Sequence, residues 1–170
     1  NDTVTARGKT RHSGLEAQTR YALGELSPAL DNLSVYASYA YVNAEIREKG
    51  DTYGNQVPFS PKHKGTFGVD YKPGSWTFNL NGDFQSSQFA DNANIVAESA
   101  DGSTGRIPGY MLWGTRVAYD FGPQMANLNL ALGVKNIFDH AYYTRSYDDN
   151  NKGLYAGQPR TLYLQGSMKF

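Results

Sequence analysis

The last ten residues of the chain alternate between two kinds of side chain almost without interruption. One side of the run holds Leu162, Leu164, Gly166, Met168 and Phe170, and the other holds Thr161, Tyr163, Gln165, Ser167 and Lys169. A period of two predicts a β-strand with one apolar face and one polar face. Most soluble domains end in a polar, frayed tail, so a terminus that is itself a strand predicts a β-sheet protein.

Six further stretches alternate in the same way, and no helical period of comparable quality is present. The runs are Arg11–Leu23, Leu33–Glu45, Lys64–Lys72, Ser75–Phe89, Gly109–Phe121 and Ala126–Phe138. Together with the C-terminal strand they predict an all-β fold, an antiparallel meander of about seven strands paired with their neighbours. The apolar, outward face is expected to hold Trp76, Phe78, Leu80, Leu128, Leu130, Leu132, Leu162 and Leu164. The inward face is expected to hold Asn79, Asp83, Asn129, Lys135 and Gln165.

The connections between the runs differ in length in a regular way. Short or moderate ones occupy Gly24–Asn32, Lys72–Ser75 and Gly122–Met125, and long polar ones occupy Arg47–His63, Ala90–Pro108 and Asp139–Gln158. Short turns on one side and long loops on the other are typical of transmembrane β-barrels of the bacterial outer membrane. Aromatic residues gather at the short-turn end of their strands, as in an interfacial aromatic girdle: Tyr21, Tyr71, Trp76, Tyr119, Phe121 and Phe170.

The composition excludes several kinds of binding site and bears on the choice between a soluble and a membrane β-fold. The net charge is zero, which gives no basic surface for nucleic acid, and without cysteine there is no disulfide or thiolate metal site. A soluble β-sandwich would have to bury many amides and charges, at a cost of several kcal/mol in total unless each is paired. A passive porin or a soluble β-sandwich binding module remains the alternative at this point.

A sheet of seven strands leaves two edge strands unpaired. Hydrocarbon does not tolerate unpaired strand edges, so we expect the seven strands to belong to a larger barrel.

Several segments resemble one family, the TonB-dependent outer-membrane receptors. These are Gly8–Glu16, Val57–Lys64, Ile107–Tyr110, and Gly133–Asp139 followed by Tyr142-Tyr143. Two further segments, Arg145–Gly153 and Tyr155–Tyr163, resemble the last loop and last strand of the ferric dicitrate receptors within that family. Because receptor loops vary with ligand, the loop resemblance bears on the substrate more than a strand resemblance does.

The resemblance implies that residues 1–170 are the C-terminal portion of a 22-stranded barrel, without its plug domain and earlier strands. It implies an outer-membrane receptor that imports ferric citrate, a form of iron–siderophore uptake, with energy from TonB through regions outside this chain. The expected partners are ferric dicitrate, outer-membrane lipid and, through Phe170, the outer-membrane insertion machinery. No cofactor is expected, because citrate itself holds the iron.

The resemblance also suggests substrate-binding residues. By position Asn150 corresponds to a ligand-binding loop asparagine of the family, and Arg145 is a plausible addition because guanidinium matches carboxylate geometry. The alternative is that Asp148–Asn151 form an ordinary turn, for which Asp and Asn are well suited. The spacing of His12, His63 and His140 matches no metal site. No catalytic constellation is found, so we do not expect an enzyme.

Overall fold

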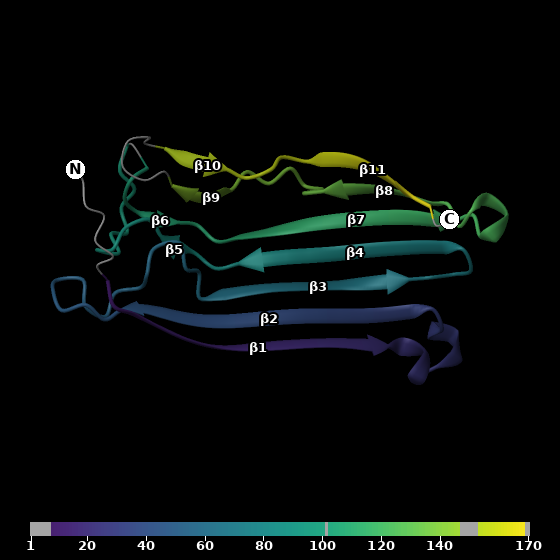
Figure 1. Ribbon diagram of the computed structural model, residues 1–170, viewed down its shortest axis with the longest axis horizontal. Coiled ribbons are helices and arrows are strands. Elements are labelled where there is room, and N and C mark those ends of the chain that lie inside the picture. The colour runs from purple at the N-terminus through teal and green to yellow at the C-terminus, as the bar shows by residue number, and fades with distance from the viewer. Residues whose placement is uncertain (1–7, 101, 147–152, 169–170) are drawn as a thin grey trace.

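The computed structural model describes residues 8–100, 102–146 and 153–168. Seven strands form one antiparallel sheet, and each strand pairs with its neighbours along the chain (Figure 1). They are β1 (Thr10–Ala22), β2 (Leu33–Ile46), β3 (His63–Tyr71), β4 (Trp76–Gln85), β7 (Tyr110–Asp120), β8 (Asn129–Lys135) and β11 (Thr161–Ser167). The sheet order is β1-β2-β3-β4-β7-β8-β11, which confirms the predicted meander.

Short elements lie in the connections, and the sequence analysis predicted none of them. Two small antiparallel pairs occupy long loops: β5 (Gln88–Phe89) with β6 (Arg106–Ile107), and β9 (Tyr143–Ser146) with β10 (Leu154–Ala156). Three 3-10 turns occupy the other connections: η1 (Leu23–Glu25), η2 (Pro28–Leu30) and η3 (Pro123–Met125). Elements of two to four residues are too short to display a period. Figure 1 shows the long loops with their small pairs at one end of the sheet and the short connections at the other.

Two strands, β4 and β8, end well inside their alternating runs. β4 ends at Gln85 because Gln88–Phe89 leave the main sheet and pair with Arg106–Ile107. β8 spans only Asn129–Lys135 because a positive φ interrupts the extended backbone on either side, at Asn127 (φ 48°) and at Asn136 (φ 51°). Leu128, predicted on the outward face, therefore lies in the turn before β8.

The two faces of the sheet differ as the alternation predicted. The outward face carries large apolar side chains in the open: Trp76, Phe78, Leu80, Leu130, Leu132, Leu162 and Leu164. Leu164 is 76% exposed and Leu162 71% exposed. No second sheet covers these side chains in the described part of the chain, as a sandwich would require. Among the described residues, no helix is long and apolar enough to span a membrane.

Aromatic rings at the short-turn end contact one another across three strands. Trp76 meets Tyr119 at 4.8 Å between ring centroids, and Tyr119 meets Phe121 at 4.8 Å. Phe78 stacks on both Trp76 (5.8 Å) and Tyr71 (6.1 Å). The predicted ring of aromatics is thus confirmed for β3, β4 and β7. Phe170 lies outside the described residues.

Glycine and tyrosine fit together on the inward face. The ring of Tyr163 on β11 lies over Gly133 of β8, where an added Cβ would come within 2.2 Å of the ring carbon Cζ. The hydroxyl of Tyr36 lies in the same way over Gly68 of the next strand, 2.4 Å from an added Cβ. Each glycine therefore makes room for a tyrosine ring of the adjacent strand. The ring lies against the inward face of the sheet as a result.

Candidate functional site

The two residues predicted to bind substrate belong to the loop between β8 and β11. Asn150 lies outside the described residues, so its assignment stays a prediction. The backbone of Arg145 lies in β9, paired with Tyr155 of β10. The β9–β10 pair therefore places Arg145 in a small hairpin at the long-loop end of the sheet.

This hairpin rests on the loop between β4 and β7. The side chain of Gln88, which is 2% exposed, donates its Nε2 hydrogen to the carbonyl of Thr144 at 2.6 Å. Between the two loops lies a groove of about 750 Å³, whose walls include Glu98, Arg106 and Tyr143. Arg106 is exposed there, so the groove holds a cationic donor close to the predicted ligand loop.

Asn136 fastens the two ends of the same loop together. It is buried (5% exposed), and its left-handed backbone turns the chain out of β8. Its Nδ2 donates to the carbonyls of His140 (3.0 Å) and Gln158 (3.1 Å), and its Oδ1 accepts from the N–H of His140 (2.9 Å). The N–H of Arg160 in turn donates to Asp139 Oδ1 at 2.7 Å. The segment Gly133–Asp139 thus acts as a clamp at the base of the loop, a role the sequence analysis did not identify.

The loop between β2 and β3 is tied to its neighbour in a similar manner. The N–H of Gln56 donates to Asn94 Oδ1 at 2.7 Å, and Asn94 Nδ2 donates back to the carbonyl of Gln56 at 2.9 Å. The N–H of Phe59 donates to the carbonyl of Phe89 at 2.9 Å. The three long loops are therefore linked in series by hydrogen bonds to backbone groups and form one assembly over the end of the sheet.

Arg47 is a fixed cation at the base of the first long loop. Its guanidinium donates to the hydroxyl of Tyr53 at 3.1 Å and forms an ion pair with Glu45. The Tyr53 hydroxyl, and after it the Glu45 carboxylate, raise the pKa of Arg47 above its ordinary value. Because both partners are already present, Arg47 serves the loop structure more than ligand binding.

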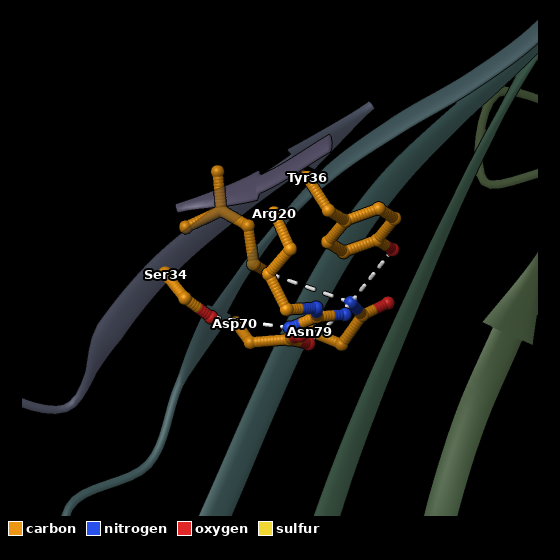
Figure 2. Close-up of polar contacts among 6 residues, drawn as sticks. Arg20, Ser34, Tyr36, Asp70 and Asn79 are labelled. Atoms are coloured by element: carbon orange, nitrogen blue, oxygen red, sulfur yellow. Dashed lines mark hydrogen bonds and ion pairs between the residues drawn. The ribbon is translucent and has the colours of Figure 1, made fainter. Parts of the chain in front are cut away.

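A row of polar side chains crosses the inward face of the first four strands (Figure 2). Arg20 of β1 donates to Asp70 Oδ2 of β3 at 2.6 Å and to Ser34 Oγ of β2 at 3.2 Å. Asn79 of β4 donates to Asp70 Oδ1 at 2.8 Å and to the hydroxyl of Tyr36 at 3.0 Å. The guanidinium of Arg20 also lies 4.8 Å from the ring centre of Tyr36. This network joins four strands and satisfies the carboxylate of Asp70, which is 8% exposed.

The three histidines lie apart from one another. His12 belongs to β1, and His140 contributes backbone groups to the clamp. His63 Nδ1 lies 2.7 Å from the hydroxyl of Tyr39 on the outward face. Among the described residues, no group of three or more His, Cys, Asp or Glu side chains is placed to hold a metal ion. The described loop end also carries an exposed guanidinium, that of Arg106 in the groove, and a guanidinium group suits the binding of an anion.

Comparison with known proteins identifies a family. A family profile described as "TonB dependent receptor-like, beta-barrel" matches residues 1–137. A curated relative, the metal-pseudopaline receptor CntO of Pseudomonas aeruginosa, is 29% identical over 169 residues, which are 96% of this chain and 21% of that protein. The ferrichrome outer membrane transporter/phage receptor of Escherichia coli is 26% identical over 96% of this chain and 20% of its own length. The chain thus spans about a fifth of the curated relatives it matches.

Solved structures agree with this assignment. The ferric citrate transporter FecA, in its unliganded form, is 85% identical over the whole chain with a TM-score of 0.93, and the chain covers 26% of it. The siderophore receptor PiuA of Acinetobacter baumannii is 20% identical over 96% of this chain, with a TM-score of 0.72. At 20% identity the second structure supports the fold alone.

Proposed function

Because the chain belongs to the TonB-dependent receptor family, as part of its outer-membrane β-barrel, we propose that it comes from a receptor that imports ferric citrate. The observation that carries this proposal is the 85% identity to the ferric citrate transporter FecA over every residue of the chain. The family match also argues against the soluble sandwich and the passive porin. Receptors of this family are transporters, so the proposed activity is uptake and not catalysis.

The fold fits the C-terminal part of a 22-stranded barrel. The strands β4 and β7 have 10 and 11 residues, which is the length of a tilted strand that crosses a bilayer. The apolar outward face would contact outer-membrane lipid, and the polar inward face would line the lumen around a plug domain. In this proposal the missing strands, the plug and the TonB-binding region belong to the rest of the receptor, and Phe170 is a signal to the insertion machinery.

The long loops would bind ferric dicitrate on the outer side. The chelate is an anion, so amide and guanidinium donors are suitable partners for its carboxylates. We assign Asn150 as a donor to a citrate oxygen, with Arg145 as added positive charge. The iron is the cargo and stays coordinated by citrate, so no resident metal or cofactor is needed.

The test is binding of ferric citrate to the intact receptor, the full-length protein that contains this chain, with Asn150→Ala. One lost hydrogen bond to a charged acceptor costs about 1.5–3 kcal/mol, so affinity should fall roughly ten- to a hundredfold. Asn151→Ala is the matched control, since it removes the same amide one position along the loop. Equal affinities for Asn150→Ala and wild type would make Asn150 a turn residue. If wild type ignores ferric citrate and binds another chelate, the substrate assignment fails and the family assignment stands.

A further inference from the structure

Two cations of the inward face, Arg116 and Lys135, lie outside the polar network. Arg116 of β7 lies directly opposite Asn79 of β4 in the sheet register, next to the strands that the network joins. The carboxylate of Asp70 is already occupied by Arg20 and Asn79. No carboxylate of the described residues lies within ion-pair distance of Arg116 or of Lys135.

Both cations line one cavity of about 350 Å³ on the inward face. On its other side Arg116 faces Gly133 of β8, and Lys135 follows two residues later on the same face. The ammonium of Lys135 lies 5.7 Å from the ring centre of Tyr163, the ring that covers Gly133. The ring of Tyr163 occupies the space over Gly133 and lines the same cavity as the two cations.

One carboxylate, Asp83, also lines this cavity, and its two oxygens already have donors. Thr66 Oγ1 donates to Asp83 Oδ1 at 2.6 Å, and Asn81 Nδ2 donates to Asp83 Oδ2 at 2.9 Å. Both donors are neutral, so they satisfy Asp83 without using either cation. Arg116 is half-buried, and an ionic contact strengthens as water is excluded around it. The cavity is thus suited to an incoming carboxylate.

The position of the cavity suggests which anion it receives. Its walls include Tyr142 and Gln158, which belong to the loop between β8 and β11. That loop is the one assigned above to ferric citrate, and the cavity lies on the lumen side at its base. We propose that Arg116 and Lys135 form an inner-wall subsite that takes the carboxylates of ferric citrate after it leaves the outer loops. This inference rests on the proposed function and adds a second binding site for the same ligand.

The first experiment separates binding from uptake in the intact receptor. Arg116→Gln with Lys135→Gln removes both charges and keeps long polar side chains. Equilibrium binding of ferric citrate to the purified double variant should change by less than about threefold, because the outer loops are intact. The rate of iron uptake from ferric citrate by cells should fall at least tenfold. Lys72→Gln, at the exposed β3–β4 turn, is the control and should leave both unchanged. Normal uptake by the double variant would overturn the subsite.

The second experiment detects the anion at Lys135 itself. Saturating ferric citrate should slow acetylation of Lys135 in the purified receptor at least fivefold, measured by mass spectrometry, and should not slow acetylation of Lys72. Arg116→Gln should abolish the protection. Equal rates with and without ferric citrate would overturn the proposal. A Lys135 that is already unreactive without ligand would also overturn it, since it would indicate an ion pair with a carboxylate of the plug.

The two proposals fail in different ways. A wild-type receptor that neither binds nor imports ferric citrate contradicts the proposed function. In that case the acetylation of Lys135 is measured with iron-free citrate. Slower acetylation supports a subsite for polycarboxylates, and an unchanged rate refutes it. Normal binding and uptake of ferric citrate by wild type, with no protection of Lys135, contradicts the subsite alone.

Discussion

Replacing Leu164 with arginine should lower the free energy of unfolding of the intact receptor by about 2–4 kcal/mol, whereas the same change at Gln165 should cost less than about 1 kcal/mol. The two residues are adjacent in β11 and lie on opposite faces. Leu164 is 76% exposed on the outward face, opposite Leu132 of β8. Gln165 lies on the inward face, opposite Ala131.

The magnitude follows from the surroundings of each face. An arginine that faces hydrocarbon at the middle of the bilayer costs about 2–4 kcal/mol, and one in a wet lumen costs little. A loss of 2–4 kcal/mol changes the ratio of folded to unfolded protein roughly thirty- to nine-hundredfold. Because both variants add the same side chain to the same strand, effects on strand propensity are matched.

The assay is denaturant titration of the receptor in lipid vesicles, with the folded fraction read from its heat-sensitive gel mobility. Leu164→Arg should shift the midpoint to a clearly lower denaturant concentration than Gln165→Arg. Equal midpoints for the two variants would refute the assignment of the faces. A greater loss for Gln165→Arg would show that the polar face of β11 is the one in contact with lipid.

The same titration tests three further sets of contacts within the sheet. Asn136→Ala should cost about 3 kcal/mol, since it removes three hydrogen bonds and leaves alanine in a left-handed backbone; a cost below 1 kcal/mol would contradict the clamp. Gly133→Ala should cost about 1–3 kcal/mol by overpacking against Tyr163, and added Tyr163→Ala should recover part of it; no recovery would contradict this contact. Arg20→Gln should cost less than about 1 kcal/mol because the arginine side chain is 55% exposed. Asp70→Ala should cost about 1.5–3 kcal/mol because it removes the acceptor of two donors; equal costs at Arg20 and Asp70 would refute this asymmetry.

The alternation of side chains determined most of the wall from the sequence. A strand places successive residues on opposite faces, so a local pattern is enough to find the strand and its apolar side. Leu162 and Leu164 were placed outward in this way, and Asn79 and Asp83 inward. The short turn at Lys72–Ser75 was predicted in the same way, because hairpin turns depend on neighbouring residues only. The aromatic residues beside this turn then marked the short-turn end of the sheet.

Contacts between distant residues were decided by the tertiary structure. Arg20 and Asp70 are 50 positions apart in the chain, and nothing near either residue indicates its partner. The end of β8 at Asn136 depends on carbonyls of His140 and Gln158, which only the folded loop brings within reach. The cavity that Arg116 and Lys135 line is formed by side chains of β4, β7, β8 and the loop after β8, which only the register of the sheet and the folded loop bring together. A sequence pattern repeats along one strand, whereas pairing across strands depends on register, and register is set by the whole sheet.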